Sequence, residues 1–239
     1  MTYRNFITPF AIAASFAACS YPSDAAQAAT SSATEACLQQ HIGELDTLLT
    51  MELIVPYVKG APEEVEVAYD KERLNELSYS WPGDRTRTMS GSTMKIEIPI
   101  PNMISLGGIK AYTDSDYYDR DSKDPVKRFH RGHHNMTAEE REKAAAAINE
   151  NMKDEDEKTR KIANKILGAA TARIMFEPVA DIGDVAAWNI RTKELDVLTG
   201  ATEFSLQVDV SADNEKNKTV AKELARSVLD DCKGASVGE

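Results

Sequence analysis

The segment Glu194–Val210, ELDVLTGATEFSLQVDV, decides the fold of this 239-residue chain. Apolar and polar residues alternate on both sides of Gly200-Ala201, which is typical of two strands that each bury one face. The glycine between the two runs predicts a tight turn, so the segment is expected to form an antiparallel hairpin. The apolar positions expected to share its buried face are Leu195, Val197, Phe204, Leu206, Val208 and Val210.

Further elements are predicted on both sides of this hairpin. Two strands should precede it, at 173–179 and 185–188, and a helix with apolar residues at helical spacing should follow it at 220–232. Near the N-terminus, an apolar stripe from Leu38 to Leu53 predicts one amphipathic helix. Three alternating strands are expected after that helix, at 65–69, 77–81 and 94–100, with a turn at Pro82-Gly83-Asp84 and a stop at Pro99 and Pro101.

This order of elements predicts an α+β sandwich, in which helices flank an antiparallel sheet. The sandwich should be a single domain at 36–233, followed by a short tail at 234–239. Residues 102–159 depart from the strand pattern and are expected to form a helical and loop insertion with a mobile loop at 113–136. Within the insertion, Thr137 and Glu140 match a capping box at a helix start.

Composition and charge limit the function. The chain is 42% hydrophobic and 28% charged, as globular domains are, and its formal net charge is −11. An acidic chain is a poor partner for nucleic acid, whose binding depends on Lys and Arg at the phosphates. Membrane attachment through a basic face is also disfavoured, because anionic lipid headgroups repel an acidic surface. After residue 18, the sequence lacks an apolar run long enough to predict a transmembrane helix.

The N-terminus has the layout of a secretory signal, with a basic Arg4, an apolar stretch at 6–18 and small residues at its end. Its last residues, Phe16-Ala17-Ala18-Cys19, resemble the lipobox of bacterial lipoproteins. The resemblance implies that the signal peptide 1–18 is removed and that Cys19 receives a diacylglycerol and palmitate anchor. The protein would then be held on the bacterial envelope, at the outer membrane facing the periplasm, through a flexible tether at 19–35. The alternative is ordinary secretion, with cleavage near Ala26-Gln27-Ala28 and loss of Cys19.

The two other cysteines, Cys37 and Cys232, lie at the two ends of the predicted domain. In an oxidising compartment such a pair is expected to form a disulfide that joins these ends. The alternative is two free thiols.

Four stretches of the C-terminal part together resemble a known pattern: Ile182–Trp188, Leu195–Gly200, Phe204–Val210 and Ala221–Leu229. The pattern is that of small exported bacterial lipoproteins of uncharacterised function, whose fold is similar to that of Mog1 and PsbP. The resemblance implies the same sandwich and a non-enzymatic domain. It transfers no catalytic residue.

The clearest candidate ligands lie close together in the insertion: His130, His133, His134 and Met136. Imidazole and thioether groups suit copper, and imidazoles with carboxylates suit zinc. The alternative is a basic, solvated loop, because Arg128 and Arg131 are interleaved with the histidines. Five aspartates before this segment could bind calcium but fail the EF-hand pattern: Asp114, Asp116, Asp119, Asp121 and Asp124.

Evidence for catalysis is weak. The chain has no G-x-S-x-G, H-E-x-x-H or P-loop motif, and turn chemistry explains Asp181 and Asp184 around Gly183. Trp81 and Trp188 fall at strand positions and are expected to pack in the core. The main hypothesis is therefore a lipid-anchored, non-enzymatic domain, without a required cofactor, that binds an envelope protein or a small ligand. The alternatives are a copper- or zinc-binding lipoprotein and an exported hydrolase.

Overall fold

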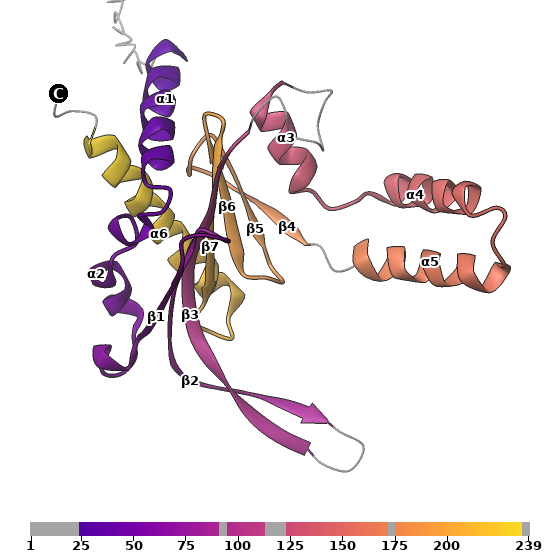
Figure 1. Cartoon of the computed structure of the whole chain (residues 1–239), viewed down its shortest axis with the longest axis horizontal. Coiled ribbons are helices and arrows are strands. Elements are labelled where there is room, and N and C mark those ends of the chain that lie inside the picture. The colour runs from indigo at the N-terminus through magenta and orange to yellow at the C-terminus, as the bar shows by residue number, and fades with distance from the viewer. Residues whose placement is uncertain (1–23, 91–94, 113–122, 172–174, 236–239) are drawn as a thin grey trace, which may run out of the picture.

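The computed structural model of the chain describes residues 24–90, 95–112, 123–171 and 175–235 (Figure 1). Within them it has the predicted α+β class, with one antiparallel sheet and helices on its faces. None of the described helices is both long and apolar enough to cross a membrane. The helices are α1 (Asp24–Gln40), α2 (Met51–Ile54), α3 (Pro125–Gly132), α4 (Ala138–Asn151), α5 (Glu157–Thr171) and α6 (Asn214–Ala235). The strands are β1 (Glu66–Asp70), β2 (Glu76–Ser90), β3 (Lys95–Ala111), β4 (Phe176–Val179), β5 (Val185–Asn189), β6 (Glu194–Thr199) and β7 (Thr202–Asp209).

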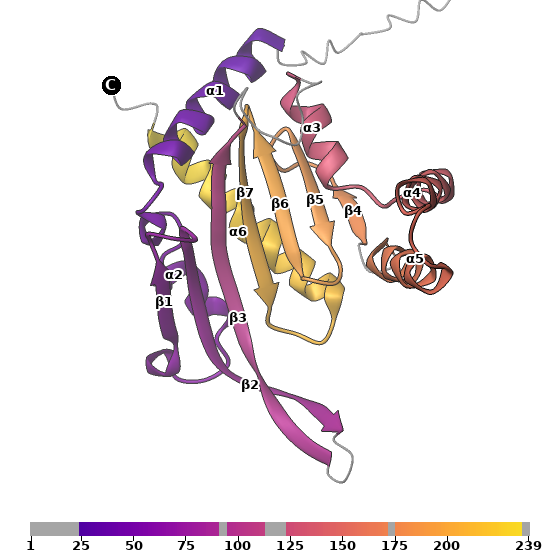
Figure 2. The same cartoon turned by 45° about the vertical axis from the view of Figure 1, so that its right-hand side comes forward.

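The described strands form one sheet in the order β1-β2-β3-β7-β6-β5-β4 (Figure 2). The predicted hairpin is confirmed, since β6 pairs with β7 and Leu195 lies opposite Leu206. Gly200 begins the turn with a φ of 60°, which glycine adopts without the penalty of a side chain. β7 also pairs with β3, so the C-terminal strands join the N-terminal ones in the middle of the sheet.

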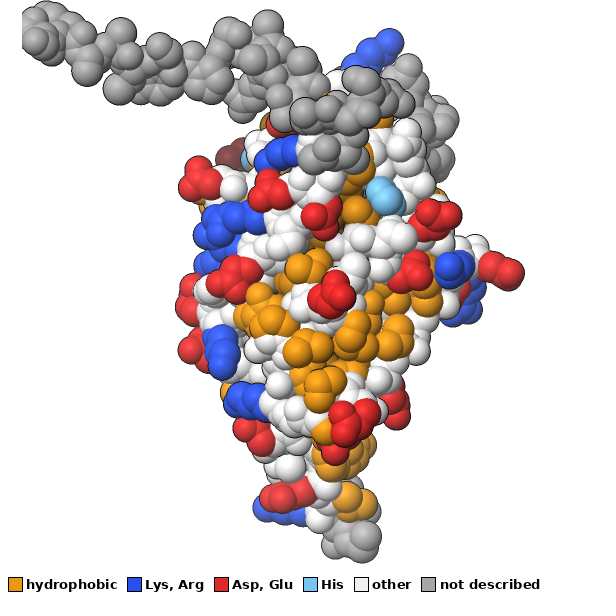
Figure 3. All heavy atoms as spheres, turned by 90° about the vertical axis from the view of Figure 1, so that its left-hand side faces the viewer, with side chains coloured by type: hydrophobic (Ala, Val, Ile, Leu, Met, Phe, Trp, Pro, Cys, Tyr) orange, Lys and Arg blue, Asp and Glu red, His pale blue; other side chains and the backbone are white. Residues whose placement is uncertain are grey.

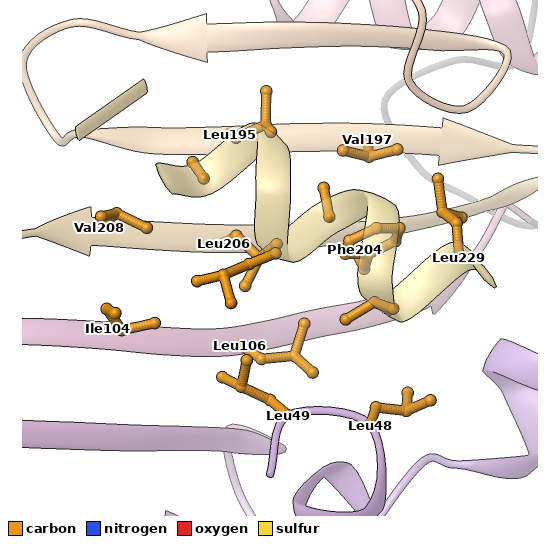
Figure 4. Packing of buried hydrophobic residues seen from close by; sticks show 14 of the residues in the cluster. Leu48, Leu49, Ile104, Leu106, Leu195, Val197, Phe204, Leu206, Val208 and Leu229 are labelled. Atoms are coloured by element: carbon orange, nitrogen blue, oxygen red, sulfur yellow. The ribbon is translucent and has the colours of Figure 1, made fainter. Parts of the chain in front are cut away.

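The main core lies between the sheet and the helices α1 and α6, which Figure 1 shows on the same side. Strand alternation directs Leu195 and Phe204 to this side, where both are fully buried (Figure 4). The predicted disulfide is present, because Cys37 of α1 is bonded to Cys232 of α6 with their Cα atoms 5.5 Å apart. It fastens the first and last helices of the described structure to each other.

The prediction of one helix from Leu38 to Leu53 is wrong. The chain breaks at Gly43, whose φ is 85°, and continues as a 3-10 turn at Leu45–Thr47 before the short helix α2. Most leucines of the predicted stripe are still buried, because each short piece packs on the core separately: Leu38, Leu45, Leu48 and Leu49. Leu53 is only partly buried and Ile42 is exposed. The tether prediction also needs correction, since residues 24–35 belong to α1 while 19–23 lie outside the described residues. Alanine is abundant there and has the highest helix propensity.

The predicted strand ends at 81 and 100 are wrong as well. Instead of a turn at 82–84, β2 and β3 continue as a long hairpin with a bulge between Trp81 and Arg85. A Cβ at Gly83 would lie 2.4 Å from the carbonyl oxygen of Ile100, so only glycine fits this close approach of the two strands. The Arg85 guanidinium donates one hydrogen bond to the Asp209 side chain and one to the Asp209 backbone carbonyl oxygen, and so fastens the bulge to the end of β7.

The insertion begins later than 102, because residues 103–107 and 110–111 pair with β7 as part of β3. It also does not end at 159, because α5 continues to Thr171. The helices between β3 and β4 are α3, α4 and α5, and Figures 1 and 2 show α4 and α5 side by side, away from the sheet. The predicted capping box is confirmed, since Thr137 and Glu140 exchange side-chain and backbone hydrogen bonds. Of the predicted loop at 113–136, residues 113–122 lie outside the described part and 125–132 form α3.

Candidate functional site

Helix α3 covers the sheet face opposite α6, and its sequence explains why it forms there. Asp124 caps its N-terminus by accepting hydrogen bonds from the backbone of Val126 and Lys127. Pro125 occupies the first helical position, where the missing N–H is not needed. Phe129 is fully buried against Leu198 and Ala187, so it anchors the helix on β5 and β6.

His133 follows directly after α3 and points back at the sheet. Its Nδ1–H donates to the carbonyl oxygen of Phe129 at 2.9 Å. The ring stacks on Phe129 with centroids 4.1 Å apart, and it meets Phe176 edge-on at 5.3 Å. The hydrogen bond and the two aromatic contacts fix the ring so that Nε2 faces the strands.

Two buried carboxylates meet Nε2 of His133. Asp196 of β6 and Glu203 of β7 lie on the strand face opposite the main core, and they are only 7% and 5% exposed. The Nε2 atom is 3.3 Å from Oδ2 of Asp196 and 3.9 Å from Oε1 of Glu203. These three side chains, called the His133 cluster below, bring together segments that are far apart in the sequence.

Neighbouring groups complete the hydrogen bonding of Glu203. The Lys110 ammonium of β3 lies 3.0 Å from Oε1, and the Tyr112 hydroxyl donates to Oε2. Burial and this contact with Glu203 raise the pKa of Tyr112 well above its usual range, so the hydroxyl keeps its proton. The Arg128 guanidinium lies over the Tyr112 ring at 4.8 Å, which places a second cation near the cluster.

The His133 cluster lies among carboxylates, and the neighbouring cations are Lys110 and Arg128. Burial opposes charge on His133, but the hydrogen bond and charge of Asp196, with the charge of Glu203, raise its pKa above the ordinary 6.5. Burial and the charge of Asp196 also raise the pKa of Glu194, the next outward-facing residue of β6. The carboxylates of Glu194, Asp196 and Glu203 therefore lie close together on this face of the sheet, with few cations to neutralise them.

The other predicted ligands lie elsewhere. His134 contacts the carbonyl oxygen of Arg131 at 2.8 Å and Oε1 of Glu140 at 3.3 Å, and the His130 side chain is exposed. Among the described residues, only His133 of the three predicted histidines belongs to a group of His, Cys, Asp or Glu side chains close enough to share an ion. Met136 is half-buried after α3.

The remaining candidates have structural roles or are not described. Of the five aspartates weighed for calcium, Asp124 caps α3 and the other four lie outside the described residues. Asp184 accepts a hydrogen bond from the backbone of Gly200 at 2.6 Å, as a turn residue does. Trp81 and Trp188 are 2% and 0% exposed, which confirms their place in the core.

A second group of candidate ligands, Cys37, His41 and Cys232, includes the disulfide. Its sulfur atoms are bonded to each other, so neither cysteine offers a thiolate to a metal in this state.

No family model, curated protein or solved structure matches the chain.

Proposed function

We propose that this protein is an exported bacterial lipoprotein, anchored through Cys19, that acts as a non-enzymatic binding domain in the envelope. The main support for this proposal is that two of the three cysteines form a disulfide and the third is the candidate lipidation site. Cys37 and Cys232 pair in the structure, which leaves Cys19, at the end of the N-terminal apolar stretch, as the third. Disulfides persist in oxidising compartments, so the bond supports export.

The proposal includes the mode of attachment. Two or more acyl chains on one residue hold a protein firmly to a bilayer, whereas a single chain binds only marginally. The net charge of −11 disfavours attachment to anionic headgroups, which is consistent with a lipid as the anchor. The outer membrane, on its periplasmic side, is the proposed location. The meander of β5, β6 and β7 followed by α6 supports kinship with the exported lipoproteins of Mog1/PsbP-like fold.

Exposed apolar surface supports binding to an envelope protein. Figure 3 shows apolar side chains gathered among acidic ones on the side of the molecule that carries α1 and α2. Val55 and Val67, of the segments on this side, are 39% and 54% exposed. Contiguous apolar surface of this kind marks interaction sites in soluble domains.

Mass spectrometry of the N-terminal peptide tests the anchor. The full chain is expressed in a Gram-negative bacterium, and its membrane fraction is compared with that of a Cys19→Ala variant. The expected peptide begins at Cys19 and carries the diacylglycerol and acyl masses, and the variant lacks the modification. A wild-type protein that is recovered soluble, with its N-terminus near Gln27, would instead establish ordinary secretion and refute the anchor.

Cross-linking in intact envelopes tests the binding role. Val67→Lys should weaken a specific cross-linked product, because it places a charge in the apolar surface. Ile166→Lys is the matched control, since Ile166 is 63% exposed on the distant helix α5. Equal products from both variants would contradict binding through this surface.

A further inference from the structure

We propose that the His133 cluster is a binding site for a divalent transition-metal ion of the zinc class. Nε2 of His133 and the carboxylates of Asp196 and Glu203 would be its protein ligands. The inference concerns the sheet face under α3 and does not depend on the lipid anchor.

The distances within the cluster suit a tetrahedral ion. Zinc binds nitrogen and carboxylate oxygen at about 2.0–2.1 Å, which places neighbouring ligand atoms about 3.3 Å apart in a tetrahedron. Nε2 of His133 lies 3.3 Å from Oδ2 of Asp196 and 3.9 Å from Oε1 of Glu203. All three ligand atoms lie within 4.8 Å of one another, so small side-chain adjustments bring them to one ion.

The ligands are oriented before any ion arrives. Nδ1–H of His133 donates to the carbonyl oxygen of Phe129, the arrangement that directs the other ring nitrogen of a metal-binding histidine to the ion. The Tyr112 hydroxyl holds Oε2 of Glu203 and leaves Oε1 to face His133. Two of the ligands stand on adjacent paired strands, which are rigid supports.

The charges around the cluster favour a dication. The cluster itself contributes the carboxylates of Asp196 and Glu203, and Glu194 of β6 adds a third that interacts with Asp196 and His133. The nearby cations are Lys110 of β3, which contacts Glu203, and Arg128 of α3, which lies over the Tyr112 ring. The Lys110 side chain is 59% exposed, so its ammonium can turn to solvent when an ion takes its place beside Glu203.

The donor set indicates the class of ion. Calcium and magnesium prefer six or more oxygen ligands, whereas imidazole suits zinc and its neighbours in the transition series. The His133 side chain is 14% exposed, which allows a water molecule to complete four-fold coordination. Binding requires Nε2 without a proton, so a proton leaves a charged His133 when the ion binds.

Calorimetric titration with zinc chloride tests the proposal. The full chain is purified in detergent without reductant, so that the disulfide stays closed and offers no thiolate. We expect one ion per chain. His133→Gln should weaken binding by more than about 100-fold, since even loss of a supporting residue costs about 10–100-fold. The matched control is the double variant His130→Gln/His134→Gln, which changes the same residue type outside the cluster and should bind as the wild type does.

A second variant keeps the test decisive if His133→Gln does not fold. Lys110→Gln removes the competing cation from an exposed side chain and should tighten zinc binding. Unchanged or weaker binding by Lys110→Gln would overturn the proposal. So would the absence of stoichiometric binding by the wild type, full binding by a folded His133→Gln variant, or loss of binding in the double variant.

Discussion

Replacing both Cys37 and Cys232 by alanine should lower the free energy of unfolding by about 5 kcal/mol. The bond joins residues separated by 195 positions, and the chain-entropy relation assigns about 5 kcal/mol to the closure of a loop of this length. Domains are usually stable by about 5–15 kcal/mol, so the loss would leave a marginal protein. The effect acts mainly on the unfolded chain, which becomes free to expand.

Urea unfolding, followed by tryptophan fluorescence under non-reducing conditions, measures this loss. Trp81 and Trp188 are buried in the core and should both report its exposure. The slope of the free energy with urea should also rise, because an uncrosslinked chain exposes more surface. Cys19→Ala is the control and should unfold as the wild type does. A double variant that loses less than about 1 kcal/mol, or a wild type unaffected by reductant, would refute the reasoning.

Three further perturbations test separate parts of the structure. The pKa of His133 is raised because Asp196 and Glu203 outweigh the effect of burial, so its charged form stabilises the fold fully below pH 6.5 and less as pH rises through the folded value. In chelator, the melting temperature of the wild type should therefore exceed that of His133→Gln by more at pH 6 than at pH 9, and a gap that widens with pH would contradict this. Gly183→Ala should lower the free energy of unfolding in urea by roughly 1–3 kcal/mol, because φ of Gly183 is 59° and a Cβ there would lie 2.5 Å from the carbonyl oxygen of Leu198. An unchanged free energy would show that the turn relaxes to accept the side chain. Thr137→Ala removes the capping box and should weaken α4 by about 1 kcal/mol. Amide hydrogen exchange should then become faster in α4 and α5 and stay unchanged in β6. Equally faster exchange in β6 would contradict the separation of α4 and α5 from the sheet.

The sequence predicted the strands wherever alternation was unbroken. Alternating apolar residues on both sides of a short turn predict β6 and β7, and apolar positions at helical spacing predict the closing helix α6. Prediction failed in β2 and β3, where proline usually ends a strand. There the bulge after Trp81 and the close approach at Gly83 let the ladder continue past Pro99. These are tertiary contacts that local sequence does not report.

The candidate site was only half predictable. The spacing of the histidines marks His133 as a candidate ligand, but it does not distinguish His133 from His130 and His134. Asp196 and Glu203 occupy the polar positions of an alternating hairpin, which normally face water. Asp196 and Glu203 are buried because α3 covers this face of the sheet. The position of α3 depends on contacts of Phe129 with strands that are distant in the sequence, so local sequence does not report it.

X-ray absorption at the zinc edge of the loaded, oxidised protein tests the central claim most directly, because it identifies the ligand atoms of the bound ion. A site made by the His133 cluster should give only nitrogen and oxygen neighbours at about 2.0–2.1 Å. The spectrum of Lys110→Gln should match it. Sulfur at about 2.3 Å would assign the ion to a thiolate or thioether, such as Met136, and would contradict the account.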